Sequence, residues 1–314
     1  MRKKLVLIFF AVLCTASLAF PTDIEKIEPG NWWTGMKDSK LELLVYGKDL
    51  DGTSVTIEAE DVEVVAVENA DSPDYLFVTL DIGKDQKAGK IKLLFKKGKF
   101  FQKISYELKE RSENSAIRKG FDQSDVFYLI MPDRFANGDI SNDTTANTLE
   151  GTDRNNSNGR HGGDIAGMIS KLDYLQTLGV TTIWPTPLWE SNHVKNTYHG
   201  YACRDFYNID PRYGNNLLYK QFADECHKRG LKLVMDVVPN HCSISHPWIQ
   251  NLPLKDWIHP APKTPGRALA ISAWNDPYVS EKDFLLNKDG WFSPLMPDLN
   301  QNNEKVLRYL VQNT

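Results

Sequence analysis

The sequence has no excess of charge of one sign. Its 37 Lys and Arg residues stand against 41 Asp and Glu residues, which gives a formal net charge of −4 over 314 residues. Binding to nucleic acid rests on clustered Lys and Arg residues opposite phosphates, and no basic stripe occurs in either half of this chain. We therefore expect no nucleic-acid partner. A neutral polymer such as a polysaccharide is compatible with this charge balance, which does not by itself indicate one.

Long hydrophobic runs are also scarce. Residues 5–13 form an apolar run that is too short to span a bilayer comfortably, and no later run approaches the eighteen apolar residues typical of a spanning helix. This run follows Arg2, Lys3 and Lys4 and precedes the small residues Ser17 and Ala19, a pattern typical of a secretory signal peptide. We expect residues 1–19 to be a cleaved signal peptide and the protein to be exported, to the periplasm or the extracellular medium, without stable membrane insertion. An uncleaved membrane anchor is the alternative.

Cysteine is rare as well, with 4 residues in the chain. Removal of the signal peptide leaves Cys203, Cys226 and Cys242, and an odd number leaves at least one thiol unpaired within the chain. This excludes a small disulfide-stapled scaffold. Cys226 follows Phe222 by four residues and Leu218 by eight, and this helical spacing predicts a buried, apolar role for it.

The residues present in abundance are those of a folded protein, 41% hydrophobic and 11% aromatic. Residues 22–112 predict short strands rich in β-branched and aromatic residues, separated by turn signals such as Asp51-Gly52. Such spacing is typical of an antiparallel β-sandwich. The polar stretch 109–120 predicts a linker. The predicted strands are 41–46, 54–57, 62–67, 75–80, 90–95 and 101–106.

After this linker the pattern changes to an alternation of strands and helices. Apolar strands are predicted at 126–130, 180–184 and 231–238, with helices at 168–178 and 217–229 between them. Such alternation is typical of a parallel sheet with crossover helices. The uniformly apolar strands indicate that helices cover them.

Four motifs follow one another in this second region. They are GVTTIWPTP at 179–187, YHGY at 198–201 with DFY at 205–207, DVVPNH at 236–241, and MPDLN at 296–300. In this order they resemble glycoside hydrolase family 13, the α-amylase family. The resemblance covers about residues 118–314 and implies a (β/α)₈ TIM barrel, of which the sequence holds the first three strands and an inserted domain B at about 242–300. The whole chain is then multidomain, an all-β sandwich followed by an incomplete α/β barrel.

The resemblance also implies roles for four residues near the ends of the second and third strands, where the active site of such barrels lies. Asp236 would support the active site. His199 and His241 would donate hydrogen bonds to hydroxyls of the sugar at the cleavage point, and Tyr201 would stack against that sugar. A single His after a strand is more often a structural hydrogen-bonding group, but the ordered motifs favour substrate binding here.

A second cluster of polar residues is predicted to hold a metal ion. Carboxylate, amide and carbonyl oxygens close together on a loop suit Ca²⁺, although Asn, Asp and Gly also gather in ordinary turns. The cluster resembles the calcium loop of the neopullulanase and cyclomaltodextrinase branch, which favours Ca²⁺, with Gly162 contributing its carbonyl. The proposed ligands are Asn137, Asp139, Asn142, Asp143, Gly162 and Asp164.

Residues 31–36, NWWTGM, resemble the start of the N-terminal domain of cyclomaltodextrinase-type enzymes. Trp32 and Trp33 could form a platform on which a sugar stacks, but paired tryptophans more often belong to a sandwich core or an interdomain contact. Relatives often dimerise through this domain, so the resemblance also implies a homodimer.

Retaining glycosidases need a carboxylate nucleophile and a carboxylic acid about 5 Å apart. In family 13 the nucleophile lies in a GxRxD pattern, which this sequence lacks. We therefore expect residues 1–314 to be the front portion of a retaining hydrolase, without nucleophile or general acid and inactive alone. The complete protein would cleave α-1,4 bonds of maltooligosaccharides, cyclodextrins or pullulan. The alternative is a truncated protein that binds α-glucan oligosaccharides without cleaving them. Asp298 stands where that branch usually has Lys, which puts the preference for α-1,6 bonds in doubt.

Overall fold

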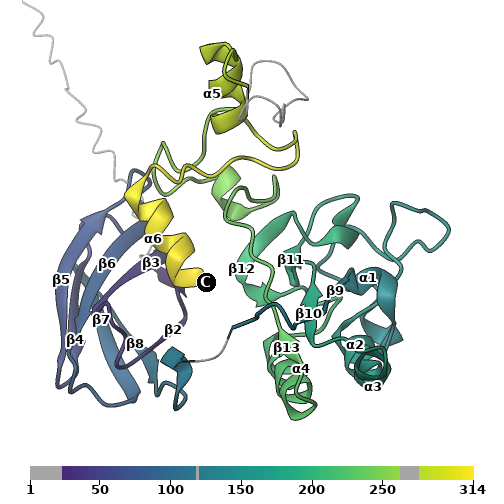
Figure 1. The fold of residues 1–314 in the computed structure, drawn as a ribbon. Coiled ribbons are helices and arrows are strands. Elements are labelled where there is room, and N and C mark those ends of the chain that lie inside the picture. Colours follow the sequence, from purple (N-terminus) through teal and green to yellow (C-terminus); the bar gives the residue numbers. More distant parts are fainter. Residues whose placement is uncertain (1–22, 118–119, 262–275) are drawn as a thin grey trace, which may run out of the picture.

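The computed structural model describes residues 23–117, 120–261 and 276–314, so the signal peptide expected at residues 1–19 lies outside the described part. No helix among the described residues has both the length and the apolar character needed to cross a membrane. Figure 1 shows a strand-rich N-terminal part beside a mixed part, with the last helix lying next to the strand-rich part.

The N-terminal part is a sandwich of two four-stranded sheets, as the strand spacing predicts. Its alternating apolar residues form one enclosed core, which includes Leu43, Val78 and Phe95. One pairing departs from the antiparallel expectation, since the short strand β2 runs parallel to β8. The first sheet has the order β1 (Asp23–Glu28), β3 (Lys40–Lys48), β6 (Tyr75–Ile82) and β5 (Val62–Asn69). The second has the order β2 (Asn31–Trp33), β8 (Phe100–Lys109), β7 (Gly89–Lys97) and β4 (Ser54–Glu58).

The strands β3 and β6 are buried on both faces, unlike strands that face water on one side. Leu43 and Val78 pair across the two strands and point into the sandwich core. Their neighbours Leu44 and Phe77 belong instead to a second hydrophobic cluster, which is formed mainly by residues of the mixed part. The sandwich is therefore joined to the rest of the chain by a shared core.

The mixed part contains the start of a parallel barrel, β9 (Phe127–Ile130), β10 (Thr182–Pro185) and β13 (Lys232–Leu233), in the order β13-β10-β9. Both contacts are parallel, as the alternation of strands and helices predicts. The third strand is shorter than the predicted span 231–238. Its only strand partner in the described ranges is β10, so no neighbour on the other side extends the ladder.

Residues 165–177, before β10, form two helical segments, α2 (Ile165–Ser170) and α3 (Leu172–Thr177). They replace the single helix predicted at 168–178, because Lys171 between them leaves helical geometry with φ −110° and ψ 8°. The helix α4 (Asn216–Lys228) follows as predicted and buries Phe222 and Cys226. The remaining elements are η1 (Ser115–Ile117), α1 (Pro132–Phe135), η2 (Ile140–Asn142), β11 (Trp189–Ser191), η3 (Thr197–His199), β12 (Cys203–Ile209), η4 (Pro247–Ile249), α5 (Glu281–Asp289) and α6 (Glu304–Asn313).

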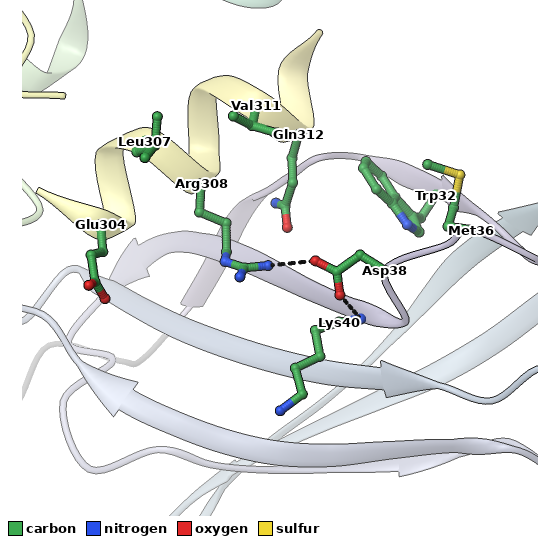
Figure 2. Close-up of a pocket in the computed structure, with 9 residues that line it drawn as sticks. All are labelled: Trp32, Met36, Asp38, Lys40, Glu304, Leu307, Arg308, Val311 and Gln312. Carbon is green, nitrogen blue, oxygen red and sulfur yellow. Dashed lines mark hydrogen bonds and ion pairs between the residues drawn. The ribbon is translucent and has the colours of Figure 1, made fainter. Parts of the chain in front are cut away.

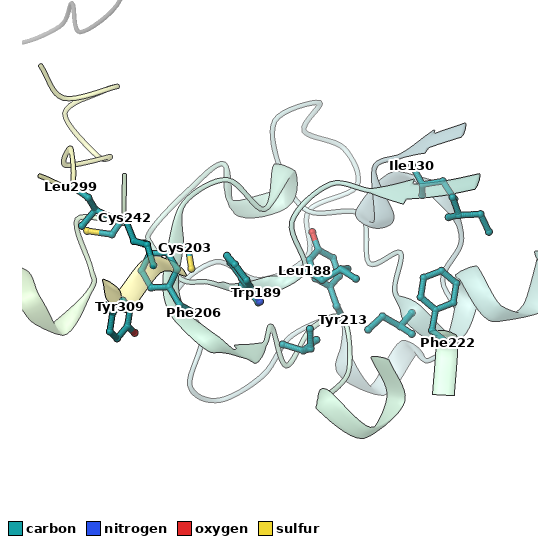
Figure 3. Packing of buried hydrophobic residues seen from close by; sticks show 14 of the residues in the cluster. Ile130, Leu188, Trp189, Cys203, Phe206, Tyr213, Phe222, Cys242, Leu299 and Tyr309 are labelled. Atoms are coloured by element: carbon teal, nitrogen blue, oxygen red, sulfur yellow. The ribbon is translucent and has the colours of Figure 1, made fainter. Parts of the chain in front are cut away.

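The last helix, α6, lies between the sandwich and the mixed part. On the sandwich side, the Gln312 side chain accepts a bond from the Glu42 amide at 2.8 Å and donates one to the Glu42 carbonyl at 2.7 Å. On the other side, the Tyr309 ring packs edge-on against the rings of Phe206 and Trp248, with centroid distances of 6.1 and 5.1 Å. Figure 3 shows Tyr309 beside Phe206 within this cluster.

All three described cysteines are free and buried, and the apolar role predicted for Cys226 is confirmed. Cys203 and Cys242 lie in the same hydrophobic cluster as Cys226 (Figure 3). Residues 262–275, which fall within the predicted domain B, are outside the described part.

Candidate functional site

The candidate substrate site lies at the carboxyl ends of β10 and β13. One carboxylate oxygen, Oδ2 of Asp236, accepts hydrogen bonds from Trp184 Nε1 at 3.1 Å and from the Tyr201 hydroxyl at 2.9 Å. The loop that carries Tyr201 approaches closely because Gly200 has φ 82° and a Cβ there would lie 2.0 Å from the Pro187 carbonyl oxygen. Two strand ends and one loop thus converge on a single carboxylate.

The two predicted histidines both contact Tyr201. His199 Nδ1 accepts a bond from the Tyr201 amide at 2.9 Å, so its proton resides on Nε2, and its ring stacks on the Tyr201 ring at 5.9 Å. His241 Nε2 donates to the Tyr201 carbonyl at 2.9 Å, and its Nδ1 lies 3.1 Å from Asn240 Nδ2. His241 therefore uses both ring nitrogens on protein groups, and the structure places it as a support of Tyr201. His199 retains Nε2–H as a donor.

Burial keeps the titratable groups around Asp236 uncharged. Burial, with smaller effects of His193 and His241, lowers the pKa of His199 to about 4. Burial likewise lowers the pKa of His241, and burial together with the bond to Asp236 raises the pKa of Tyr201 to about 12. An uncharged donor and an aromatic ring beside one carboxylate suit a neutral, hydroxyl-rich ligand better than an anion.

The candidate metal loop brings its six predicted residues together, with the Asp139 side chain alone bonded elsewhere. Asn137 Nδ2 donates to Asp143 Oδ1 at 2.6 Å, and Asn142 Nδ2 donates to Asp164 Oδ2 at 3.2 Å. A Cβ on Gly162, whose φ is 87°, would lie 2.4 Å from Asp143 Oδ1. The left-handed backbone and the nearby carboxylate together favour glycine at position 162.

Asp139 is the predicted residue whose carboxylate is bonded outside this group, although its amide donates to Asp164 Oδ2 at 2.8 Å. It is exposed, and its Oδ1 accepts bonds from the Ser141 amide and hydroxyl at 3.0 and 2.6 Å, which hold the pKa of Asp139 below its ordinary value. Asp164 is buried and caps α2, because its Oδ1 accepts bonds from the Gly138 and Gly167 amides at 3.0 and 2.6 Å. The Asp139 carboxylate thus acts within its own turn, whereas the Asp164 carboxylate joins residues 138–142 to the start of α2.

Two buried atoms support a cation in this loop. The amide oxygens of Asn137 and Asn142 have no hydrogen-bond partner among the described residues, although buried polar atoms are normally paired. Hard oxygen donors of this kind suit Ca²⁺. The described residues contain no group of three or more His, Cys, Asp or Glu side chains able to hold a metal, so the donors would be chiefly amide and carbonyl oxygens.

Trp32 and Trp33 separate into two environments. Trp32 is 8% exposed and packs in the sandwich core, in agreement with the core interpretation, whereas Trp33 is 38% exposed. Trp32 and Met36 also line a groove of about 610 Å³ between the sandwich and α6. Figure 2 shows this groove, with Arg308 of α6 reaching toward Asp38. The groove contains none of the residues around Asp236.

Sequence reasoning missed two residues that hold the substrate loop, Glu150 and Arg160. Glu150 accepts bonds from the amides of Asn196 and Thr197 at 2.9 and 2.6 Å, and Arg160 donates to the Thr197 carbonyl at 3.3 Å. Both act on backbone groups far along the chain. Backbone partners leave no residue pattern, so no sequence signal could have found them.

A β-sandwich followed by the first strands of a parallel α/β barrel, with Asp, Tyr and His side chains at the strand ends, defines a protein of the barrel-type glycoside hydrolase class. Residues 129–314 match the model of the alpha amylase catalytic domain, and residues 26–112 match that of the cyclomaltodextrinase N-terminal domain. The chain belongs to the α-amylase family.

The chain is similar to several named members of that family. It is 33% identical over 195 residues to a cyclomaltodextrinase of Bacillus sp, covering 60% of this chain and 32% of the relative. It is 40% identical over 117 residues to neopullulanase 2 of Thermoactinomyces vulgaris, covering 37% and 19%. The crystal structure of an Anoxybacillus α-amylase matches with a TM-score of 0.50 and 34% identity, over 61% of this chain and 37% of that chain. The matched part therefore covers between 19% and 37% of the length of these relatives.

Proposed function

We propose that the complete protein is a retaining hydrolase of α-1,4 bonds in maltooligosaccharides, cyclodextrins or pullulan, and that this chain supplies part of its sugar-binding site. The observation that carries the proposal is the convergence of Tyr201 and Trp184 on Asp236, with His199 stacked beside Tyr201. The similarity to a cyclomaltodextrinase and a neopullulanase supports the substrate class.

The proposed site binds a glucose unit without a charged contact to it. The Tyr201 ring presents an apolar face to the sugar ring, and His199 Nε2–H donates to a sugar hydroxyl. Asp236 holds the Tyr201 hydroxyl and so fixes the ring plane. His241 fixes the backbone of the same residue. Tyr201 and His199 thus bind the sugar, Asp236 and His241 orient Tyr201, and none of the four has a bond-breaking role.

Isothermal titration calorimetry of the chain with maltotriose tests the site. We expect Tyr201→Ala to weaken binding about five- to tenfold, because one aromatic contact contributes about 1 kcal/mol. Tyr174→Ala is the matched control, since Tyr174 is 56% exposed on α3. Equal affinity of Tyr201→Ala and the wild type would remove the proposed sugar contact.

The second candidate function is glucan binding without cleavage by the 314-residue chain itself. The absence of a GxRxD pattern from its sequence favours this function, because the family nucleophile lies in that pattern. Reducing-sugar release from maltohexaose distinguishes the two functions. Release above a boiled-protein blank by the purified chain would rule out the binding-only function for it.

We assign Ca²⁺ to the loop of Asn137, Asn142, Asp143, Gly162 and Asp164. The two unpaired amide oxygens support this assignment, and a bound cation would supply charge that stabilises the loop. Ca²⁺ that binds the folded state alone raises its stability by about 2.7 kcal/mol at 100 times Kd. A thermal unfolding midpoint that is the same in Ca²⁺ and in EDTA would refute the assignment.

Export to the periplasm or the medium, and a homodimer formed through the N-terminal sandwich, complete the proposal. Mass spectrometry of the protein recovered from cell fractions tests export, because cleavage after residue 19 fixes the mass of the mature chain. Analytical ultracentrifugation tests the dimer, and a monomer at all accessible concentrations would exclude it.

A further inference from the structure

Glu150 lies in the segment between the candidate metal-loop residues Asp143 and Gly162, but its carboxylate reaches away from that loop. Its Oε1 accepts a bond from the Asn196 amide at 2.9 Å. Its Oε2 accepts bonds from the Thr197 amide and the Thr197 hydroxyl, both at 2.6 Å. All three donors stand at the start of η3, the turn that carries His199 toward Tyr201.

The conformation that Glu150 holds is one the loop would not readily adopt alone. Asn196 has φ 61°, a left-handed backbone that an L-residue rarely adopts. The amides at the start of a helical turn have no partner within that turn. Thr197 is fully buried, so water cannot take over its bonds. The Glu150 carboxylate therefore stabilises a left-handed and otherwise unpaired stretch of backbone.

Glu150 is itself held in place, which allows it to fix the position of another segment. Its carbonyl accepts a bond from Arg212 Nη1 at 2.7 Å. The amide of the preceding residue, Leu149, donates to Asn192 Oδ1 at 2.8 Å. Asn192 is buried. The carboxylate is thus carried by backbone that is tied on both sides to buried groups.

Arg160 makes a second contact with the same turn, at a backbone carbonyl group. The fully buried Arg160 donates from Nη1 to the Thr197 carbonyl at 3.3 Å and lies over the Tyr213 ring at 4.6 Å. Tyr213 in turn donates its hydroxyl to the Tyr198 carbonyl at 2.9 Å. Thr197 is therefore held at its amide by Glu150 and at its carbonyl by Arg160.

We propose that Glu150 is a positioning residue for the sugar-binding loop: through the Asn196 and Thr197 amides it sets the loop in the conformation that brings His199 and Tyr201 to Asp236. This inference rests on the proposed function only for the identity of the ligand. Glu150 touches the loop and not the sugar. Without it, the loop must be ordered at the moment of binding, which reduces affinity.

The test is Glu150→Gln in the full chain, because Gln keeps the shape but replaces one acceptor oxygen with an NH₂ group facing N–H donors. Asp153→Asn is the matched control. It makes the same chemical change in the same segment, but the Asp153 side chain accepts from the Asn155 amide at 3.3 Å and not from the loop. Hydrogen exchange of the Asn196 and Thr197 amides is the first measurement. We expect exchange at least tenfold faster in Glu150→Gln and unchanged in Asp153→Asn.

Maltotriose affinity is the second measurement. We expect Glu150→Gln to bind about tenfold more weakly than wild type and to add no further loss in a chain that also carries His199→Ala and Tyr201→Ala. If Glu150→Gln only destabilised the fold, its loss of maltotriose affinity would be the same with and without the His199 and Tyr201 side chains. If Glu150→Gln does not fold by circular dichroism, Thr197→Val carries the exchange test, because it removes one of the three donors.

Unchanged exchange at the two amides overturns the proposal, and so does a full additional loss of affinity in the His199→Ala, Tyr201→Ala background. A wild-type chain that binds no maltotriose refutes the proposed sugar site instead, and the exchange measurement then still decides the role of Glu150.

Discussion

The buried ion pair of Arg212 and Asp210 gives a sharp prediction about stability. The two side chains are 1% and 0% exposed. Arg212 donates from Nε to Asp210 Oδ1 at 2.9 Å and from Nη2 to Oδ2 at 2.7 Å. The change Arg212→Met removes the guanidinium and leaves the carboxylate with backbone donors, the Ser191 amide at 3.1 Å and the amide of residue 212 at 2.9 Å. The buried carboxylate then lacks its ion-pair partner, and Arg160 is the cation whose charge still acts on it.

We expect Arg212→Met to lower the free energy of unfolding at pH 7 by about 3–5 kcal/mol, the usual cost of breaking one side of a buried pair. The sign of the pH dependence follows from Asp210. Burial raises its pKa, but the bonds and the charge of Arg212 more than offset this and hold the pKa below its ordinary value. The wild-type contribution is therefore present above the unfolded pKa of about 3.9 and is lost as the pH falls below it.

In Arg212→Met the two largest effects that offset burial are gone, while the charge of Arg160 and the bond from the Ser191 amide remain, so the pKa of Asp210 rises and acidification relieves the strain. The stability gap between wild type and variant should narrow from pH 7 to pH 4. Urea unfolding followed by circular dichroism at both pH values measures it, with Asp210→Asn/Arg212→Met as the control that removes the charge. A gap below about 1 kcal/mol at pH 7, a gap independent of pH, or a double variant no more stable than Arg212→Met would refute this reasoning.

Three further predictions concern single side chains. Asn142→Ala should abolish the rise in unfolding midpoint on adding Ca²⁺, because it removes a buried amide oxygen that lacks a protein partner; a rise equal to that of wild type would contradict this. Burial raises the pKa of Cys226 to about 12, so it should resist iodoacetamide at pH 8 in the folded chain and react in guanidinium, as mapped by mass spectrometry; labelling of the native chain would be the contrary result. Burial holds the pKa of His199 at about 4, below its ordinary 6.5, so the unfolded state takes up its proton first. His199→Gln should therefore lose less stability than wild type between pH 6.5 and pH 4. Parallel plots of the thermal unfolding midpoint against pH for the two proteins would contradict the lowered pKa of His199.

The local pattern of the sequence predicts the elements better than it predicts their partners. Alternating apolar residues indicate the strand at 75–80, and the structure has β6 there (Tyr75–Ile82). The same alternation does not show that Phe77 faces a different cluster from Val78. The apolar residues of α6 do not show that this helix packs against β3. A pattern of side chains records that a face is buried, not which surface buries it.

In the candidate site, too, the sequence predicts the residues better than it predicts their contacts. The motifs place Tyr201 and Asp236 at neighbouring strand ends, and the structure joins them through one hydrogen bond. Asp139 was expected among the metal ligands because of its residue type, yet its carboxylate caps η2 through Ser141. Short-range bonds of this kind compete with metal binding, and the sequence alone does not rank the two.

The outward faces of β3 and β6, with Leu44 and Phe77 in the core of the mixed part, bear on how the two domains could be separated. A protease cut in the segment between β8 and β9 would break the covalent link but not the shared core, so both fragments should elute as one particle in gel filtration. The same faces limit which domains could replace the barrel part of this chain. A foreign barrel fused behind this sandwich would need a complementary apolar surface, or Leu44 and Phe77 would be left facing water.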